Sequence, residues 1–578
     1  MGRPAAAAEV AKAAVKAAAE GWRIIPRPLL ETILNNYALH HRVPQPVVLH
    51  GPRGVGKTSL LLHRLLPEWN KGPHVAAYVD LAGDPSATRP WASFSAASAL
   101  PALGALRGRL ERELEALVDH GVRRGTIGSR DVFTALNKWH GLDTALRRII
   151  GPGRLSKKDE AASASALWSK ALLAFSVRIG TGEINVSLAV SEEKAMVAGG
   201  TRKYSMDEVA YMREAVTSLK LAKEVIGMHQ EWRREAMKHL NWTGGFSRSL
   251  ANSSTDWPCI LLDILSAAAE VDFFQPKLVI NNVDVLRKAI FSDDSTVSAA
   301  VYHDSFIWRL IALGANDRCL PVILVTSDSY YSYQAFIDFG FPDIFISRET
   351  FGWTHQEAKL HMVSQFFSES EWKVIDEVLG PNPRQLSELY MLKKSSYYLE
   401  VMRDGSSNFE DVVDAYLAYL QVTVVNPAME SVLVILQKFA SDVRTGTVPI
   451  DRLHFGAPWR HPPHTDDPVA SLKWAKIQLM DFVQSFVNVE FGVNFLADDS
   501  LEILDDPSIV AMLEVGLLYK QRDPSFIRPI TRGIQRCLAR WLVQQKMQMR
   551  FGERVTYLWQ RVMRGRSYRH LMKEIGYK

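Results

Sequence analysis

The sequence predicts an α/β protein whose core is a parallel sheet and whose later regions are mainly helical. Two observations predict this fold class. Residues 46–50 and 75–81 are short apolar runs of strand length, with a helix-like run between them. A glycine-rich loop, residues 51–58, joins the first run to that helix. Strand, loop, helix and strand in this order indicate a parallel sheet, because parallel strands need a crossover connection.

Length and composition predict several domains in a soluble protein. The chain has 578 residues, of which 47% are hydrophobic and 23% charged, and about 150 residues per domain gives roughly three or four units. The net charge of +5 is mild and does not by itself require a nucleic-acid partner. Cys259, Cys319 and Cys537 lack metal-ligand spacing, which favours a reducing compartment without disulfides. No apolar run reaches the roughly 18 residues of a transmembrane helix, so we expect no membrane span.

The N-terminal segment is expected to be helical or flexible. Residues 5–19 are rich in alanine with scattered basic residues, as in organelle transit segments. Glu9, Glu20 and the absence of serine argue for an exposed helix instead. We therefore predict a cytoplasmic protein, with a mitochondrion or another organelle as the alternative. The first core helix, residues 29–40, follows Pro28, a residue that suits a helix start.

Residues 51–58 read Gly-Pro-Arg-Gly-Val-Gly-Lys-Thr and match the G-x-x-x-x-G-K-[ST] pattern of a phosphate-binding loop. Glycines let the backbone wrap around phosphates, and the start of the following helix attracts the anion. Lys57 would reach the β- and γ-phosphates, and the Thr58 hydroxyl would ligate Mg²⁺. We therefore predict ATP and Mg²⁺ as ligands of a P-loop NTPase core. The predicted nucleotide-binding residues are Gly51, Pro52, Arg53, Gly54, Val55, Gly56, Lys57, Thr58 and Ser59, with Thr326 from a later strand.

Residues 84–255 are predicted to form a large, mainly helical insertion, with long helices at residues 105–120 and 206–232. Between these helices, residues 175–191 alternate apolar and polar residues on both sides of Gly180-Thr181-Gly182-Glu183, which predicts a β-hairpin. A segment this long between two sheet strands decorates the core rather than forming a structureless loop.

Two further buried strands carry polar residues at their carboxyl ends. The first starts at Lys277 and reaches Asn281 and Asn282, and the second, residues 320–326, ends in Thr326. In an open parallel sheet the ligand binds at the carboxyl ends of the strands. We therefore expect these strand ends to face the phosphate loop.

The chain after residue 350 is predicted to form a helical lid and a mainly α-helical C-terminal domain. Residues 380–386, Gly-Pro-Asn-Pro-Arg-Gln-Leu, open one lid helix. A helix at residues 507–514, two strands around an Arg522-Asp523-Pro524 turn and a helix from Ile530 indicate a winged-helix variant. The other predicted elements are helices at 351–365, 371–379, 409–424, 427–442 and 472–487, and a strand at 489–495.

These elements resemble the archaeal-ATPase-like branch of the STAND group of P-loop NTPases, which are relatives of the AAA+ ATPases. Four pieces carry the resemblance in order: the phosphate loop with Ser59-Leu60-Leu61, the Tyr78-Val79-Asp80-Leu81 strand end, the strand 277–284, and residues 380–386, which match a G-x-N-P-R-x-L motif. The resemblance covers roughly residues 25–400, with the insertion between its second and third pieces.

The resemblance implies an ATP-dependent switch. ATP would lie between sheet and lid, Arg384 would approach the γ-phosphate as a sensor, and closure would be passed to the C-terminal part. An arginine on a mobile element pairs strongly with phosphate and so biases open against closed states. The resemblance also implies a polar γ-phosphate sensor at Thr326 or Ser327, for which strand capping is the alternative.

The sequence departs from this family where the strand 277–284 ends. The family typically has Asp-Asp or Asp-Glu there, whereas this chain has Asn281 and Asn282. An amide forms hydrogen bonds but lacks the charge and basicity of a general base. Asp284 would lie on the face of Asn282 if the strand continues, and would substitute for the missing carboxylate. The predicted catalytic residues are Asp284, Asn282 and Arg384, and the predicted metal ligands are Thr58, Asn281 and Asp284.

Residues 536–578 form a basic tail with interleaved aromatic residues. Arginines and lysines greatly outnumber Glu553 and Glu574. The aromatic residues among them are Trp541, Phe551, Tyr557, Trp559 and Tyr568. This pattern is typical of a nucleic-acid surface. The alternative is an amphipathic helix whose aromatic residues pack while its charges are solvated.

We therefore predict a nucleotide-dependent molecular switch, with slow hydrolysis of ATP or none. The alternatives are a nucleic-acid-binding or remodelling ATPase and a nucleotide-binding scaffold. A protein partner would bind the insertion or the C-terminal region, and nucleotide would promote an oligomer. The predicted units are residues 1–24, the core 25–350 with the insertion 84–255, the lid 351–400, the winged-helix-like domain 401–535 and the tail 536–578.

Overall fold

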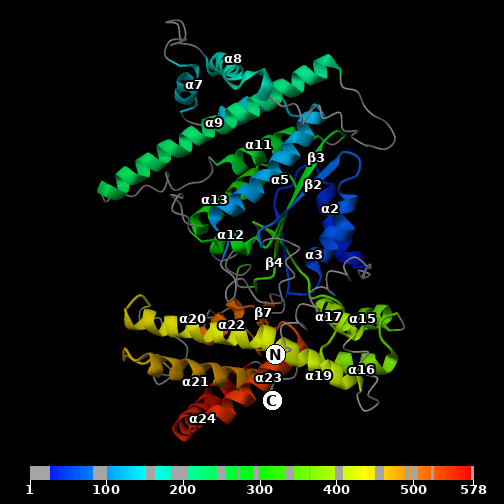
Figure 1. Ribbon diagram of the computed structural model, residues 1–578, viewed down its shortest axis with the longest axis vertical. Helices are drawn as coiled ribbons and strands as arrows, with labels where there is room; N and C mark the ends of the chain where they lie inside the picture. The colour runs from blue at the N-terminus through cyan, green and yellow to red at the C-terminus, as the bar shows by residue number, and fades with distance from the viewer. Residues whose placement is uncertain are drawn as a thin grey trace.

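Two hydrophobic cores organise the chain. The first runs in sequence from Leu34 to Phe345 and surrounds the sheet, and the second runs from Trp353 to Tyr557 and is mainly helical. Figure 1 shows the two bodies one above the other along the long axis. The computed structural model describes residues 26–82, 100–138, 141–151, 163–183, 205–243, 256–270, 272–290, 299–316, 318–329, 331, 344–363, 365–396, 408–448, 461–487, 495–496, 506–521 and 526–574.

The sheet of the first body is parallel, as predicted. Its strands are β1 (Val47–His50), β2 (His74–Asp80), β3 (Gln275–Asn281), β4 (Val322–Thr326) and β5 (Ile346–Glu349). They pair in the order β2-β3-β4-β1-β5. At the carboxyl edge Asp80 is opposite Asn281, and His50 is opposite both Thr326 and Glu349. The register therefore aligns polar residues from different strands along one edge.

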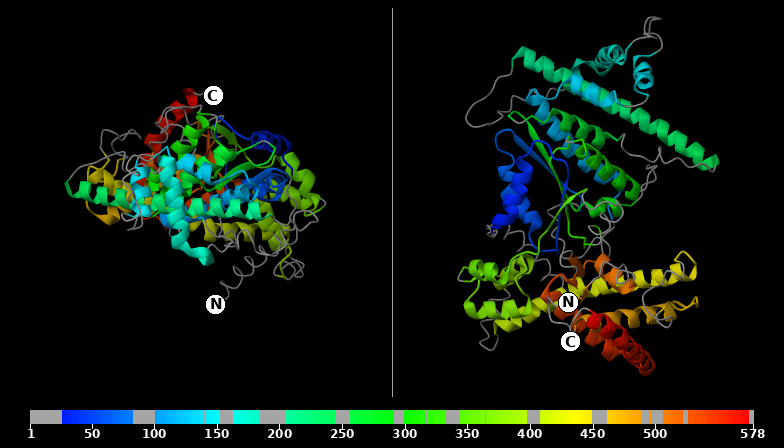
Figure 2. Two further views of the ribbon diagram at one scale, coloured as in Figure 1. Left: turned by 90° about the horizontal axis from the view of Figure 1, so that it is seen from above. Right: turned by 180° about the vertical axis from the view of Figure 1, so that it is seen from behind.

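Helices cover both faces of this sheet. They are α2 (Pro28–Leu39), α3 (Lys57–Leu60), the π-helical turn η1 (Leu61–Leu65), α4 (Leu66–Glu68), α5 (Leu103–Arg123), α11 (Trp257–Ala268), α12 (Asp284–Lys288) and α13 (Ala299–Gly314). In Figures 1 and 2, α2 and α3 lie on one side and α5, α11 and α13 on the other. Strands β1, β3 and β4 are buried along their whole length for this reason.

The described part of the insertion is helical, and the predicted hairpin is wrong where it can be checked. Besides α5, the helices are α6 (Ser129–Leu136), α7 (Leu142–Ile150), α8 (Ala164–Glu183) and α9 (Met206–Thr243). Helix α8 occupies the first half of the predicted hairpin, while residues 184–191 lie outside the described residues. Leu167, Ala171 and Phe175, spaced by four, are all buried on one side of α8. Helical packing therefore prevails over the short alternating pattern.

The second body consists of helices and a small antiparallel sheet of order β6-β8-β7. Its strands are β6 (Phe495–Leu496), β7 (Leu518–Gln521) and β8 (Phe526–Pro529). Its helices are α15 (His355–Met362), α16 (Glu369–Val378), α17 (Pro383–Lys393), α19 (Phe409–Leu420), η3 (Gln421–Val425), α20 (Asn426–Arg444), α21 (Pro468–Val487), α22 (Pro507–Glu514), α23 (Arg532–Gln548) and α24 (Phe551–Glu574). Most of the predicted strand 489–495 lies outside the described residues.

One helical stretch among the described residues, Phe409–Arg444, is long and apolar enough to cross a membrane by length and composition alone. Its buried side chains include Leu420, Val425, Met429 and Leu436, which belong to the second hydrophobic core. A core helix of a folded domain meets the same criterion.

Candidate functional site

The phosphate loop has the backbone geometry that its glycines permit. Gly54 and Gly56 have φ values of 79° and 88°, in the left-handed region that favours glycine. Helical structure starts at Lys57 directly after the loop and continues through η1 and α4. Gly51 lies so close to Thr350 that an added Cβ would be 2.0 Å from the Thr350 carbonyl oxygen. The loop thus adjoins the end of β5 on one side and a helix N-terminus on the other.

A cavity of about 360 Å³ lies beside this loop. Residues from the loop, from the end of β4 and from the start of α17 line it together. They are Arg27, Gly54, Val55, Gly56, Lys57, Thr58, Ser59, Leu60, Ser327, Trp353, Pro383, Arg384 and Ser387. The structure therefore brings the predicted loop residues 54–59 and Arg384 to one cavity, which Gly51, Pro52 and Arg53 do not line.

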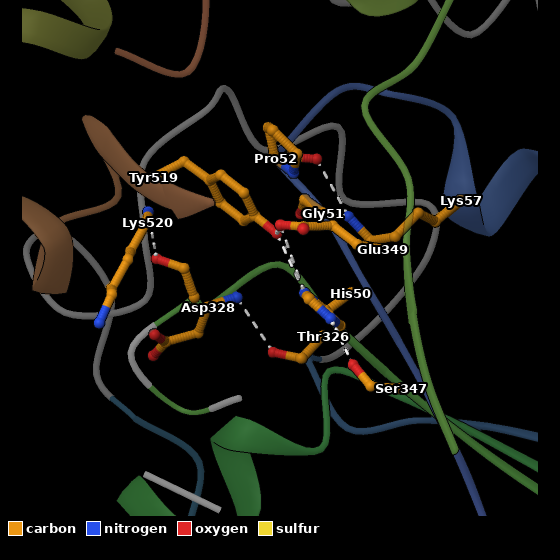
Figure 3. Close-up of polar contacts among 11 residues, drawn as sticks. His50, Gly51, Pro52, Lys57, Thr326, Asp328, Ser347, Glu349, Tyr519 and Lys520 are labelled. Atoms are coloured by element: carbon orange, nitrogen blue, oxygen red, sulfur yellow. Dashed lines mark hydrogen bonds and ion pairs between the residues drawn. The ribbon is translucent and has the colours of Figure 1, made fainter. Parts of the chain in front are cut away.

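Lys57 bends back over its own loop. The Nζ atom donates to the carbonyl oxygens of Gly51 at 2.7 Å and Pro52 at 3.0 Å (Figure 3). The pKa of Lys57 is lowered to about 7, first by burial and then by the positive charges of Arg53 and Arg27, while Asp284 opposes the shift. A phosphate at this position would provide a stronger, charge-assisted partner than the two carbonyls.

Hydrogen bonds join the segment around Arg384 to the loop. The Arg384 amide donates to the Gly54 carbonyl at 3.2 Å, and the Asn382 side chain donates to the Arg53 carbonyl at 3.4 Å. Asn382 also caps α17 by accepting from two amides. The Arg384 guanidinium pairs with Glu388 at 2.9 Å. The Arg384 guanidinium thus lies at the cavity and forms an ion pair with Glu388, one helical turn away.

The remaining wall of the cavity contains residues that sequence reasoning missed. Arg27 donates to the Thr350 hydroxyl at 2.6 Å and to the Val55 carbonyl at 2.7 Å, so it ties α2 to the loop. Trp353 and Pro383 give this wall an apolar part. The only signal for Arg27 was its position before the Pro28 helix start, and Trp353 carried no motif.

Asp284 does not continue the strand. Strand β3 ends at Asn281, Asn282 turns the chain with a φ of 56°, and Asp284 begins α12. The predicted shared face of Asn282 and Asp284 is therefore wrong. Instead Asp284 is buried and accepts a hydrogen bond from the Thr326 hydroxyl at 2.7 Å. Asp284 and Thr326 do not line the cavity, whereas Ser327 does.

The charge of Asp284 nevertheless acts on the loop. Burial, followed by the negative charge of Asp328, raises the pKa of the Asp284 carboxyl. The Asp284 charge also opposes the lowering of the Lys57 and Arg53 pKa values. The charge of the Asp284 carboxyl is therefore felt at the loop although this carboxyl does not line the cavity.

Asp80, at the end of β2, organises both asparagines. The Asn281 amide donates to one Asp80 carboxylate oxygen at 3.0 Å, and the Asn282 amide donates to the other at 2.8 Å. The Ala82 backbone amide donates to the same carboxylate at 2.9 Å. Because both NH₂ groups face a carboxylate, both amide carbonyl oxygens are turned away from Asp80. A carboxylate thus stands on the neighbouring strand β2, beside the two asparagines of β3. The sequence marked Asp80 only as part of the Tyr78–Leu81 strand end and gave it no role.

The second body contacts the residue before the loop. His50 Nδ1 lies 3.1 Å from the Tyr519 hydroxyl of β7, and its Nε2 lies 2.8 Å from the Ser347 hydroxyl (Figure 3). Tyr519 donates to Glu349 at 2.6 Å, and the Lys520 amide donates to the Ser329 hydroxyl at 2.9 Å. The small antiparallel sheet is therefore anchored at the carboxyl edge of the parallel sheet.

Comparison with solved structures gives a distant likeness. No family model and no curated protein matches the chain. Among solved structures the chain is similar to the Walker-type ATPase PABY2304 of Pyrococcus abyssi, with a TM-score of 0.35 and 12% sequence identity over 89% of this chain and 96% of that chain. At this TM-score the two structures agree only in the coarse arrangement of their chains.

Proposed function

We propose that this chain is a nucleotide-dependent switch that binds ATP with Mg²⁺ between its phosphate loop and the lid helices. The observation that carries the proposal is the shared cavity, because residues of the loop and Arg384 of α17 line it together. A ligand there would contact both bodies at once. The resemblance to the STAND group supports the same reading, in which α22, β7, β8 and α23 form a winged helix.

Each part of ATP has a suitable partner in this cavity. Lys57 and the loop amides would hold the β- and γ-phosphates, and Trp353 with Pro383 would contact the base. Arg384 would exchange Glu388 for the γ-phosphate, which gives the lid two alternative arrangements.

Mg²⁺ prefers oxygen ligands. Of the three predicted oxygen ligands, the Thr58 hydroxyl lines the cavity, whereas Asn281 and Asp284 do not. The described residues contain no cluster of three or more His, Cys, Asp or Glu side chains that would hold a metal alone. Mg²⁺ bound mainly by phosphates and water, with few protein ligands, suits such a site. When bound, the ion would neutralise phosphate charge.

Hydrolysis is expected to be slow because both strand-end residues are amides. Their carbonyl oxygens accept hydrogen bonds but do not take a proton from water. Asp80 would act as a positioning residue, since it fixes the direction of both amides. Asp284 is the remaining candidate base, although it lies behind the cavity wall beside Thr326.

Replacing Asn282 by Glu tests this account. The purified protein should bind ATP with Mg²⁺ in calorimetry and release phosphate at a rate close to background. Asn282→Glu should raise phosphate release by about a hundredfold, because general-base catalysis contributes roughly 10²–10⁴-fold. Asn282→Gln is the matched control, since it has the same length and the same strain at positive φ but no charge. Fast release by the wild type that is lost in Asp284→Asn would contradict slow hydrolysis and assign the reaction to Asp284.

The affinity for ATP should fall as pH rises above 7. Lys57 has a pKa lowered to about 7 in the nucleotide-free protein, and a bound phosphate would restore it toward the ordinary value of about 10.4. Above pH 7 the unbound lysine is mostly neutral, so binding takes up a proton and affinity falls by up to about tenfold per pH unit. Calorimetry at pH 8 in buffers of different ionisation enthalpy measures this uptake. At pH 8 the phosphate's own titration, with a pKa of about 6, no longer contributes. Binding without proton uptake would disprove this role of Lys57.

The partner, the nucleotide-induced oligomer, the nucleic-acid alternative and the cytoplasmic location stay predictions.

A further inference from the structure

The last helix, α24, packs on the second body through a partly polar face. Among the side chains of α24 that the structure describes, those up to residue 562, Tyr557 and Gln560 are buried. Gln478 of α21 donates to the Gln560 side chain at 3.1 Å, and Arg561 lies 3.6 Å from Asp481, also on α21. Two of the three contacting groups on this inner face are therefore polar or charged.

The opposite face of α24 is apolar and exposed. Its residues form a set that we name the apolar stripe: Phe551, Val555, Leu558, Trp559 and Val562, with exposed fractions of 84%, 51%, 53%, 50% and 68%. Their spacing of i, i+4, i+7, i+8 and i+11 places them within about 100° around the helix. A surface helix normally buries such a stripe and exposes its polar residues. Helix α24 does the reverse, so its outer face is suited to an apolar partner.

This exposure revises the expectation for the tail. Trp541 and Tyr557 are buried, as the packing alternative requires. Phe551 and Trp559, which the same alternative expected to pack, are exposed. Burial of the aromatic rings therefore holds for Trp541 and Tyr557 but not for Phe551 and Trp559, and the Tyr568 side chain lies outside the described part of the chain.

Arginines follow one edge of the apolar stripe. Arg550 and Arg554 are exposed and spaced by four residues, which places them in one row beside Leu558. Arg561 continues this row by its spacing, but it pairs with Asp481 of α21. The sequence of α24 continues with Arg564, Arg566, Arg569 and Lys573. The acidic residues of α24 are Glu553 and Glu574. The partner of this face should therefore be both apolar and negatively charged.

We propose that α24 anchors the protein to an anionic lipid bilayer, with the apolar stripe in the acyl boundary and the arginines at the phosphates. A bilayer surface provides both chemistries at once and needs only the outer face of a helix. Nucleic acid offers phosphates and stacking for aromatic rings but no apolar volume for Val555, Leu558 and Val562. A second copy would bring one arginine row against another. A protein that wraps around the helix would have to displace α21.

Vesicle flotation of the full-length protein tests the anchor. The wild type should float with vesicles of phosphatidylcholine mixed with phosphatidylserine, and much less with phosphatidylcholine alone. The double variant Phe551→Ser/Leu558→Ser should lower the partition coefficient by at least about tenfold, because two large apolar side chains no longer enter the bilayer. Arg550→Gln/Arg554→Gln should lower it by about tenfold as well. These residues are exposed, so the variants should fold normally.

Matched controls lie at the other end of the molecule. Met206→Ser removes an apolar side chain that is 85% exposed on α9, and Arg112→Gln removes an exposed arginine on α5. Both should bind vesicles as the wild type does. Equal binding to neutral and anionic vesicles, or no binding at all, would overturn the proposal. A concentration-dependent dimer, or a complex with RNA or DNA, that the Phe551→Ser/Leu558→Ser variant abolishes while vesicle binding persists unchanged would assign the stripe to that occupant instead.

Discussion

Lys57→Ala is expected to weaken binding of ATP with Mg²⁺ by at least about a hundredfold. Hydrogen bonds to charged groups contribute about 1.5–3 kcal/mol each, and the lysine would make one to each of two phosphates. In the free protein its Nζ donates to the uncharged carbonyls of Gly51 and Pro52. The variant also removes a cation whose burial is unfavourable, as the lowered pKa shows. We therefore expect a large loss of affinity with little change in thermal stability.

Isothermal titration calorimetry measures the affinity, and circular dichroism checks that the fold is retained. Lys71→Ala is the matched control, because Lys71 follows the same helix but is 65% exposed and pairs with Glu68 on the surface. The control should bind as the wild type does. Unchanged affinity in a folded Lys57→Ala protein would mean that the cavity beside the loop is not the nucleotide site.

Gly51→Ala is expected to destabilise the first body and to abolish nucleotide binding. The new Cβ would lie 2.0 Å from the Thr350 carbonyl oxygen, far below a normal contact. Thr350 has little freedom to move, because its amide donates to the His50 carbonyl at 2.9 Å and its hydroxyl accepts from Arg27. Overpacking of this kind costs about 3 kcal/mol, which lowers Tm by roughly 5–10 °C. Separation of β1 and β5 would also widen the phosphate loop.

Differential scanning calorimetry with and without ATP measures both effects. Gly227→Ala in α9 is the control, because an added Cβ there meets nothing within 4 Å. In a helix interior this change should stabilise by about 0.5–1 kcal/mol. A Gly51→Ala protein that keeps both the wild-type Tm and ATP binding would show that the Thr350 segment moves aside without cost.

The sequence predicts those strands whose whole length is buried. Strands β1, β3 and β4 each contain a short apolar run that located them in the sequence, and the half-buried strand β2 was located in the same way. Strand β5 was missed because Ser347, Arg348 and Glu349 carry no apolar pattern, and only its pairing with β1 makes it a strand. The hairpin predicted around Gly180 failed for the opposite reason. A local alternation of apolar and polar residues was visible in the sequence, and it masked the four-residue spacing of the buried helical positions.

The residues of the candidate site divide in the same way, into those that a local pattern reveals and those that only the folded chain brings together. Two short motifs, the phosphate loop at residues 51–58 and the segment 380–386, identified the loop residues and the Arg384 that line the cavity. Asp80 lies about 200 residues from the asparagines it holds, with separations of 201 and 202, and only the β2–β3 register joins them. The turn at Asn282 was also hidden, because asparagine tolerates positive φ without requiring it. Long-range pairing and backbone turns are thus what the sequence alone did not provide.

The contact between Tyr519 and His50 links two binding equilibria. His50 is covalently joined to Gly51, so a shift of β7 acts on the phosphate loop through one peptide bond. Coupling between sites is reciprocal in free energy. A membrane surface that binds the second body must therefore change the affinity for ATP by some factor. ATP must change the affinity for that membrane surface by the same factor. Measuring nucleotide affinity with and without vesicles would give this coupling constant, and its two determinations must agree.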